Sequence, residues 1–545
     1  MSPNQRLMFA VVVSIVFFIA YSTIFPHPQN EQMANIDKKE GTAPKSVQQG
    51  EQNSVATPQQ GGVSQNNASQ NVVVNESSKS DILVVKSDEF VLKVDTLGCI
   101  SSKELLQDKF NNKDGEHAQV IQHDGIKPLY IRFEDAKLNN EAISTPYSAS
   151  VSELDLQGSA KKVTLTQKLS SVVVTKELTF YPDGHYDIEI SLSNDKRYYI
   201  YLGKRPKVNK KEQAMSATGV MIYTSDELLT IIEDGDAEGR ETFSGVELTA
   251  SFDQYTAIVM YGFSKDEIII VERDRDDNPV AYFQGLKDIK LHGYIGPKEY
   301  KVLKDIKPVL THVVEYGWFT FAAKPLFQLL SYLHGIFGNW GWAIVALTLV
   351  IRLILYPLTY KGMMSMQKIK ELAPKLKEIK EKYKGDPQRT NAATMELYKK
   401  HNANPLGGCL PMLLQIPVFY AIYRLLLNSV ELQGAPWVLW IDDLSRMDPY
   451  YILPLLMGAS MFLQQRLTPQ NFTDPMQEKI MKYLPVIFTF FFLTFPSGLV
   501  LYWFVNNIFS ILQQFIVNQQ FENQKDAKKA IEKNKEQKVT GKKDD

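Results

Sequence analysis

A single arginine interrupts an apolar stretch of this 545-residue chain. Residues 340–360, as a helix, extend about 31 Å, which matches the hydrocarbon thickness of a bilayer, and Arg352 lies within them. An arginine near the centre of a spanning helix raises the free energy of insertion by about 2.5–3.5 kcal/mol. We therefore expect a neighbouring group, water or a binding partner to solvate or use this charge.

Two interpretations of Arg352 remain open. Its long side chain can extend to the nearer membrane surface, since Lys361 follows nine residues later. Alternatively it faces an enclosed polar groove, because polar residues inside spanning helices usually face the protein interior or water. Thr348, one turn earlier, and polar residues at helical spacing in 499–517 favour the groove. The candidate groove residues are Arg352, Thr348, Gln415, Trp503, Asn506, Ser510 and Gln513.

The hydrophobic residues are concentrated in a few segments, because the mean hydropathy of the whole chain is only -0.20. Residues Pro496, Ser497 and Gly498 are typical of a tight turn between the last two segments. The pattern predicts a polytopic α-helical membrane protein with six spans, of which the fourth and fifth are short enough to be buried or re-entrant instead. The six apolar segments are 7–25, 340–360, 410–428, 452–465, 483–495 and 499–517.

The N-terminal 80 residues predict an anchor and a tether. Residues 1–25 resemble either a cleaved signal peptide or an uncleaved membrane anchor. The anchor is favoured, since the apolar core is long and no A-x-A-like cleavage site follows it. Residues 26–80 are rich in Gln, Asn, Ser and Gly and poor in aromatic residues, so we expect a disordered linker.

Residues 81–311 show short runs of alternating hydrophobic and polar residues, as in 90–95, 163–169 and 186–192. Such runs separated by turn residues predict an inserted antiparallel β domain, most consistent with a β-sandwich. The chain has only two cysteines, Cys99 and Cys409, far apart in the sequence, and we expect no disulfide framework.

The charges of the connecting loops predict the topology. Residues 361–404 hold eleven Lys and Arg against five Asp and Glu, whereas 429–449 hold one arginine against four acids. The positive-inside rule places the first loop in the cytoplasm and the second outside. Counting spans from there puts both termini in the cytoplasm and the β domain outside, which makes this a multi-pass protein.

Three further segments carry recognisable patterns. Residues 361–404 repeat hydrophobic residues every three or four positions and break at Gly385, which predicts a helical hairpin that is either a solvated connector or a docking device. Residues 312–339 predict an interfacial amphipathic helix, or a last helix of the β domain. The tail, 519–545, has eight lysines but also six acids, so ribosome binding through RNA phosphates is only weakly predicted.

The composition of the spans excludes several function classes. No Asp, Glu or His lies within the six segments, whereas proton-coupled transporters place such residues in their spans. The absence also argues against acid–base catalysis in the membrane. No phosphate loop, zinc-ligand spacing or nucleophile motif occurs in the β domain. We therefore expect neither an enzyme nor a bound cofactor or metal.

Five separated motifs, in order, resemble the family of membrane protein insertases that includes the bacterial YidC, mitochondrial Oxa and chloroplast Albino proteins. The resemblance covers about residues 316–520 and is highly specific. The N-terminal anchor, the tether and the β domain are similar to those of Gram-negative members in placement. The five motifs are GNWGWAIVALTLVIRLILYPLT (338–359), NPLGGCLPMLLQIPVF (404–419), DPYYILPLLMGASMFLQQ (448–465), TDPMQEKIMKYLPVIFTFFF (473–492) and FPSGLVLYWFVNNIFSILQQ (495–514).

The resemblance implies a five-helix insertase core within 340–518, in the inner membrane, with a hydrophilic groove open to the cytoplasm and to lipid. Arg352 falls on the groove arginine of the family. The β domain is similar to sugar-binding sandwiches, with no sugar-binding role implied, and is associated in the family with Sec accessory proteins. Client helices are expected to slide along surfaces of the third and fifth helices. The residues expected there are Met412, Phe419, Phe488 and Phe491.

The expected mechanism is physical rather than chemical. A wet groove with one positive charge lowers the barrier for the short, often acidic flank of a client protein, while burial of its apolar segment in lipid supplies the driving free energy. The expected partners are nascent integral membrane proteins, the lipid bilayer, the Sec translocon with its accessory proteins, and the ribosome.

The short fourth and fifth helices are also expected to thin the bilayer. Arg424, near the outer end of its helix, is given no function. The alternative is a membrane assembly scaffold or chaperone that depends strictly on Sec.

Overall fold

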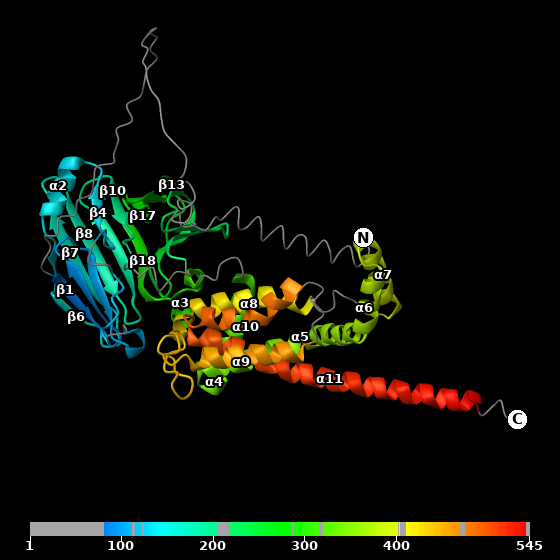
Figure 1. The fold of residues 1–545 in the computed structure, drawn as a ribbon. Coiled ribbons are helices and arrows are strands. Elements are labelled where there is room, and N and C mark those ends of the chain that lie inside the picture. Colours follow the sequence, from blue (N-terminus) through cyan, green and yellow to red (C-terminus); the bar gives the residue numbers. More distant parts are fainter. Residues whose placement is uncertain are drawn as a thin grey trace, which may run out of the picture. The chain divides into compact units, whose positions relative to one another are not determined.

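The computed structural model describes residues 81–540, apart from 112–114, 122–124, 205–216, 286–287, 315–319, 402, 404–409 and 469–474. The predicted anchor (1–25) and linker (26–80) lie outside the described residues. A β-rich domain comes first along the described chain and a helical region follows it (Figure 1).

The β-rich domain contains three sheets. The largest has nine strands in the order β12-β11-β14-β15-β18-β9-β8-β7-β5, the second has five in the order β13-β16-β17-β10-β4, and the third has four in the order β3-β2-β1-β6. Neighbouring strands are antiparallel except β1 and β6, which pair in parallel. The strands are β1 (Asp81–Lys86), β2 (Phe90–Asp95), β3 (Ile100–Leu105), β4 (Ile131–Phe133), β5 (Ser148–Ala149), β6 (Glu153–Asp155), β7 (Lys161–Lys168), β8 (Val173–Phe180), β9 (His185–Leu192), β10 (Tyr198–Tyr201), β11 (Gly219–Thr224), β12 (Leu229–Glu233), β13 (Arg240–Phe243), β14 (Val246–Phe252), β15 (Thr256–Tyr261), β16 (Ile269–Arg273), β17 (Pro279–Gly285) and β18 (Ile289–Pro297).

Alternation of residue types explains how these strands pack. Strands β8 and β9 bury every second residue, as expected where one sheet face meets the core and the other meets water. Their inward side chains join residues of the other two sheets in one hydrophobic core. Two short helices, η1 (Asp108–Phe110) and α2 (Ala136–Ser144), lie between strands in the chain. Cys99 is buried as a free thiol.

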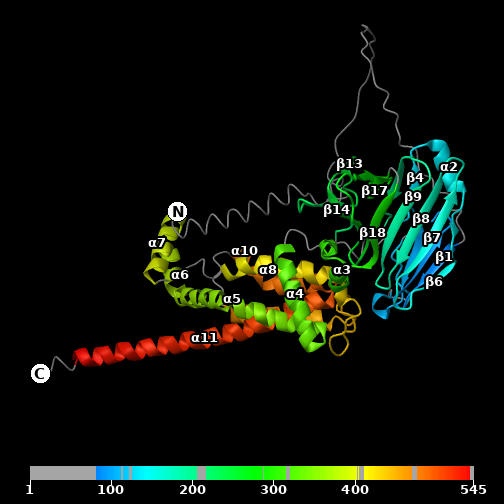
Figure 2. The ribbon, with the colours of Figure 1, turned by 180° about the vertical axis from the view of Figure 1, so that it is seen from behind.

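Helices make up the rest of the described chain. In both ribbon views α4, α5, α8, α9, α10 and α11 lie side by side, and α11 continues well past the others (Figures 1 and 2). The helices α6 and α7 form a hairpin in the stretch after α5. The elements are α3 (Tyr300–Ile306), η2 (Pro308–Val313), α4 (Thr320–Phe337), α5 (Trp340–Glu371), α6 (Ala373–Lys382), α7 (Pro387–Lys400), α8 (Leu410–Asn428), η5 (Val430–Leu432), α9 (Ile452–Leu467), α10 (Pro475–Phe492) and α11 (Ser497–Thr540).

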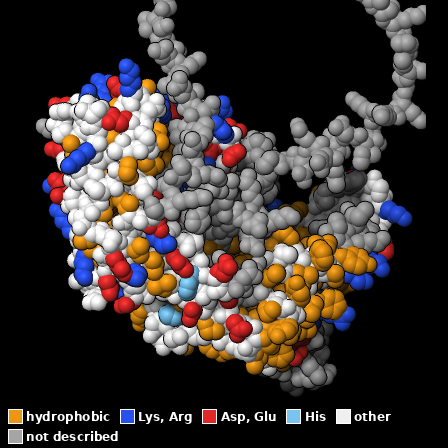
Figure 3. Space-filling view, turned by 90° about the vertical axis from the view of Figure 1, so that its left-hand side faces the viewer, with side chains coloured by type: hydrophobic (Ala, Val, Ile, Leu, Met, Phe, Trp, Pro, Cys, Tyr) orange, Lys and Arg blue, Asp and Glu red, His pale blue; other side chains and the backbone are white. Residues whose placement is uncertain are grey.

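Two helices in the described part of the chain are long and apolar enough to cross a membrane, α5 and the segment Ser497–Ala527 of α11. Large hydrophobic side chains that are exposed belong mostly to helices α4 to α11. Figure 3 shows hydrophobic side chains gathered on one part of the surface, with charged side chains scattered over the rest. Such an extended apolar surface is typical of a protein that contacts lipid.

The β-rich domain contacts the segment that joins α8 to α9. The Nε2 of Gln254 donates a hydrogen bond, at 2.7 Å, to the carbonyl of Leu427, which lies in the last turn of α8. The backbone N–H of Tyr300, at the start of α3, donates to Glu431 at 3.1 Å. Arg446 donates to the carbonyl of Asn111 at 2.9 Å. The α8–α9 segment therefore lies on the same side of the helices as the β-rich domain.

Candidate functional site

Helix α5 carries Arg352. Asn339 caps its first turn, because its side chain accepts a hydrogen bond from the backbone N–H of Trp342 at 3.1 Å. Arg352 follows about 18 Å along the axis from the first helical residue, in a stretch with no other charged residue between Asn339 and Lys361. The helix thus places one guanidinium well inside an apolar segment.

Arg352 is held by α11. Its Nε donates to Oδ1 of Asn506 at 2.9 Å, and its terminal nitrogen donates to the Asn506 carbonyl at 3.1 Å and to the Ser510 hydroxyl. Asn506 and Ser510 lie one turn apart, so both present their oxygens on one face of the helix. All three acceptors are neutral. Among the residues that the structure describes, Arg352 forms no ion pair with a carboxylate.

Two predicted groove residues lie apart from this cluster. Thr348 is buried, and its hydroxyl donates to the carbonyl of Ile344 in its own helix at 2.7 Å. Gln415 of α8 is 3.4 Å from the hydroxyl of Tyr502, a buried residue of α11 that our sequence prediction omitted. The structure thus links Gln415 to α11, one turn before Asn506, and leaves Thr348 out of the hydrogen-bonded cluster around Arg352.

The contact between α5 and α11 continues beyond Arg352 as a polar seam. Gln513 donates to the hydroxyl of Thr359 at 2.5 Å. About two turns further along α5, Gln367 donates to Asn518, and about three turns further along, Glu371 forms a 2.9 Å ion pair with Lys525. Three of the contacts, 352 with 506, 359 with 513 and 371 with 525, join residues 154 positions apart. This shared offset, from which the Gln367–Asn518 contact departs by three residues, means that the two helices run in parallel with one register along this seam.

A second face of α11, about 100° around the helix from Asn506, packs on α9. Asn507 is buried and donates to the Ser460 hydroxyl at 3.1 Å. Near it, Gly458 lets α10 approach α9, because a Cβ at this position would lie 1.9 Å from Oγ1 of Thr489. Small residues permit such close packing of membrane helices. Our sequence prediction missed both features, since neither Asn507 nor Gly458 belongs to the stripe of Asn506 and Ser510.

Trp503 belongs to an aromatic cluster rather than to the polar seam. Its ring centroid lies 4.5 Å from that of Phe419 on α8 and 5.9 Å from that of Phe488 on α10. Phe491 packs at 4.8 Å on Phe495 and is 54% exposed. Three of the four predicted client-contact residues thus line α8 and α10 around Trp503, whereas the side chain of Met412 lies outside the described residues.

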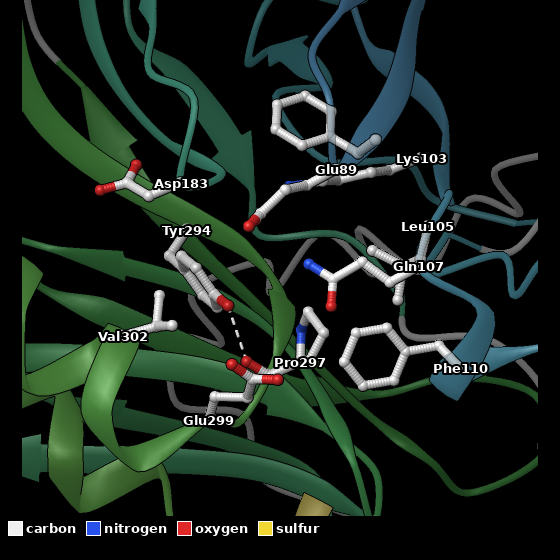
Figure 4. Close-up of a pocket in the computed structure, with 11 residues that line it drawn as sticks. Glu89, Lys103, Leu105, Gln107, Phe110, Asp183, Tyr294, Pro297, Glu299 and Val302 are labelled. Carbon is white, nitrogen blue, oxygen red and sulfur yellow. Dashed lines mark hydrogen bonds between the residues drawn. The ribbon is translucent and has the colours of Figure 1, made fainter. Parts of the chain in front are cut away.

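A separate polar pocket lies in the β-rich domain (Figure 4). Lys103 lines it, and burial lowers the pKa of this lysine to about 7. Its ammonium donates to the carbonyl of Ile295 and lies 3.9 Å from the Phe90 ring centroid. Glu299 pairs with Lys109, and the Tyr294 hydroxyl donates to the Pro297 carbonyl at 2.6 Å. The lysines here are engaged by protein groups, which indicates a structural role.

Comparison with known proteins gives consistent matches. Residues 332–525 match the family described as 60Kd inner membrane protein, and residues 280–329 match the family described as YidC periplasmic domain. The membrane protein insertase YidC of Wolinella succinogenes is 47% identical over 96% of both chains. That of Campylobacter jejuni is 46% identical over 95% of this chain and 96% of its own. A crystal structure of an active YidC insertase aligns with 80% of this chain and 94% of its own, with 19% identity and a TM-score of 0.36.

Proposed function

The chain belongs to the YidC family of membrane protein insertases, and from this premise we propose that it inserts client proteins by means of the charge on Arg352. One observation carries the proposal. The guanidinium of Arg352 is partly buried among neutral acceptors on Asn506 and Ser510. A cation inside an apolar segment and without a nearby anion attracts an acidic group that enters from outside.

The hydrogen bonds to α11 leave some N–H donors of Arg352 available to a client protein. A guanidinium has five N–H donors, and the three hydrogen bonds to Asn506 and Ser510 start from only two of its three nitrogens. The remaining nitrogen can meet a carboxylate in the short flank of a client. At about 4 Å and an effective dielectric constant of 20, such a pair gains roughly 4 kcal/mol. This gain offsets part of the penalty for moving the flank into the membrane.

The apolar segment of the client takes a different surface. We assign it to the aromatic cluster of Phe419, Phe488 and Phe491 on α8 and α10, together with Met412 of α8. Phe491 is 54% exposed, which supports contact with a passing helix. Transfer of this segment into lipid removes apolar surface from water and supplies the driving free energy. The proposed reaction forms no covalent bond and needs neither nucleotide nor cofactor.

We further propose an architecture of six membrane helices, with α5, α8, α9, α10 and α11 forming a core that encloses a hydrophilic groove. In this proposal both termini are cytoplasmic and the exported domain is a β-sandwich. The basic hairpin of α6 and α7 supports the cytoplasmic assignment of that loop. Partners proposed on family grounds are the Sec translocon, its accessory proteins and the ribosome. The short helix α9, of 16 residues, supports local thinning of the bilayer.

The test uses purified protein in nucleotide-free liposomes and a small single-span client with an acidic tail. Protease protection of the tail measures insertion. We expect insertion by the parent, a loss of roughly tenfold or more in Arg352→Ala, as a contribution above about 1.4 kcal/mol requires, and partial insertion by Arg352→Lys. Lysine keeps the charge but not the planar fork of donors.

Arg424→Ala provides the matched control, because it removes an arginine from the far end of another membrane helix. We expect it to insert the client as the parent does. Equal insertion by the parent and Arg352→Ala contradicts the proposed role of the charge. Insertion that appears only after the Sec translocon is added would instead favour a chaperone or scaffold that acts with Sec.

A further inference from the structure

The segment between α8 and α9 contains a tight loop with a leucine at its tip. Two backbone hydrogen bonds close the loop, from the N–H of Trp437 to the carbonyl of Ile441 at 3.0 Å and from the N–H of Leu444 to the carbonyl of Ala435 at 3.0 Å. Leu439 lies at the tip with φ of 56°. This left-handed conformation is unfavourable for leucine, so a loop selected only for stability would carry Gly or Asn here.

The Leu439 side chain points away from the protein. It is 84% exposed, more than any other large hydrophobic residue among those that the structure describes. A single exposed leucine is ordinary, but here the chain also holds the leucine in a strained backbone conformation that costs about 1–3 kcal/mol. Such a feature is explained if the leucine is buried by something outside the chain.

The loop is attached rigidly to the outer ends of membrane helices. Trp437 packs directly on Gly341 of α5, where an added Cβ would lie 2.1 Å from the indole ring. Asn339, the cap of α5, donates to the carbonyl of Pro436 at 2.9 Å. The rings of Trp437 and Trp342 meet edge to face, with centroids 5.8 Å apart. The tip is therefore held at the level where α5 begins.

The surroundings of the tip match the boundary between lipid and water. Exposed aromatic residues gather at the ends of the neighbouring helices, and Trp and Tyr are enriched at this depth of a membrane. The contact of Arg446 with Asn111 puts the loop on the side of the β-rich domain. Exposed aromatic residues at these helix ends are Phe337 (51%), Trp342 (46%), Tyr450 (66%) and Tyr451 (44%).

We infer that the 435–444 loop is a lipid anchor whose Leu439 side chain inserts into the outer leaflet of the membrane. The partner is the boundary between headgroups and acyl chains, where the leucine loses contact with water and the exposed Trp342 takes the amphipathic position that tryptophans favour. Through Trp437 and Gly341 the anchor sets the depth of α5 in the bilayer. This inference goes beyond the proposed insertion mechanism, since it requires only that α5 and α9 lie in the membrane and nothing of Arg352.

The test measures the environment of residue 439 in the full-length protein in lipid nanodiscs. A nitroxide is attached to Leu439→Cys in a chain in which Cys99 and Cys409 are replaced by alanine. Collision with oxygen, which concentrates in hydrocarbon, is compared with collision with a water-soluble nickel chelate. Labels at Ile354→Cys, exposed on α5, and Asp442→Cys, exposed on the same loop, supply the lipid and water references.

We expect the ratio of oxygen to nickel collisions at 439 to exceed that at 442 several-fold and to approach that at 354. A ratio equal to that at 442 overturns the inference, and so does a label shielded from both reagents, because that result means burial against protein. Leu439→Trp provides a second measurement without a label. Because the parent already holds six tryptophans, the measurement is the difference between the variant and the parent. Brominated acyl chains should quench the fluorescence that the added indole contributes, whereas quenching of that contribution by iodide alone contradicts the anchor.

Discussion

Asn506 accepts two hydrogen bonds from Arg352, one through its side-chain oxygen at 2.9 Å and one through its backbone carbonyl at 3.1 Å. One residue of α11 therefore fixes both the position and the orientation of the guanidinium. Because Asn506 is neutral, it orients the cation without cancelling its charge. A substitution that replaces the side-chain amide of Asn506 with a carboxylate tests whether orienting the guanidinium differs in effect from neutralising it.

Asn506→Asp should strongly reduce insertion while preserving the structure. The carboxylate has the shape of the carboxamide and accepts the same hydrogen bond, but it forms an ion pair with Arg352 and removes the uncompensated charge. We expect insertion of an acidic-tailed client to fall about tenfold or more, as the loss of a charge interaction of a few kcal/mol requires. Protease protection in liposomes measures the effect.

The thermal stability of the same variant distinguishes charge from geometry. Asn506→Asp should melt in detergent at or above the temperature of the parent, because the guanidinium then donates to a charged acceptor instead of a neutral one. Asn506→Ala should melt lower and retain more insertion than Asn506→Asp. If the aspartate variant inserts the client as well as the parent does, the charge of Arg352 is not what the client uses.

The location of these residues illustrates what sequence predicts in a membrane site. The spacing of Asn506 and Ser510 predicts that they share a helix face, and the rarity of a charge in an apolar segment selects Arg352. Thr348 shows the limit of this reasoning. Its hydroxyl bonds to the carbonyl one turn back in its own helix, an arrangement that Ser and Thr adopt in any helix. Tyr502 was missed because an aromatic residue in a span resembles lipid-facing sequence.

Gly458→Ala should destabilise the contact between α9 and α10. The added methyl would lie 1.9 Å from Oγ1 of Thr489, and this hydroxyl is fixed by its hydrogen bond to the carbonyl of Pro485 at 2.7 Å. Overpacking of this kind typically costs about 1–3 kcal/mol. The melting temperature in detergent checks the loss. Thr489→Ala should restore it in the double variant, whereas Thr489→Ser, which keeps the hydroxyl group, should not.

Lys176→Met should destabilise the β-rich domain. The buried ammonium of Lys176 donates to the carbonyls of Gly98 and Leu129, each at 2.8 Å, and both of these residues have positive φ. Methionine fills similar space but leaves two buried carbonyls without a donor, at about 1–3 kcal/mol each. Denaturant unfolding measures the change. Lys162→Met removes only an exposed ion pair with Glu177 and should have little effect.

Glu431 should make the stability of the contact between α3 and the α8–α9 segment depend on pH. Burial raises the pKa of this carboxyl from its ordinary 4.5 to about 7, with Glu299 adding to the rise and Lys109 and the N–H of Tyr300 opposing it. The folded protein then binds more protons than the unfolded chain between these values. Stability is therefore greatest below about pH 4.5 and declines as pH rises through 7, by at most roughly 3 kcal/mol.

Glu431→Gln should remove this dependence, because the amide oxygen still accepts from Tyr300 and carries no charge. We expect the difference in melting temperature between pH 5 and pH 8 to shrink relative to the parent. Asp442→Asn, on the exposed part of the same segment, should leave the difference unchanged. An undiminished pH dependence in Glu431→Gln would assign the effect to other groups.

The β-rich part of the fold follows from local patterns, whereas its joining to the helices does not. Alternation in 186–192 is enough to predict a strand, and β9 (His185–Leu192) alternates as expected. No periodicity predicts that Gln254 meets Leu427, because that contact depends on packing between residues far apart in the chain. The strain at Leu439 is likewise invisible to pattern analysis, since leucine gives no signal for positive φ.

The constant offset of 154 residues between α5 and α11 also constrains how the two helices can change in evolution. One residue inserted on the N-terminal side of these contacts, in α5 or in α11, would turn the contacting face of that helix by about 100°. All the contacts that follow along the seam would then be lost. Lengths in this region can therefore change without loss of the seam only in steps of about seven residues, made in both helices together. Length differences among related chains should accordingly fall in the loops, or occur as paired heptads in the two helices.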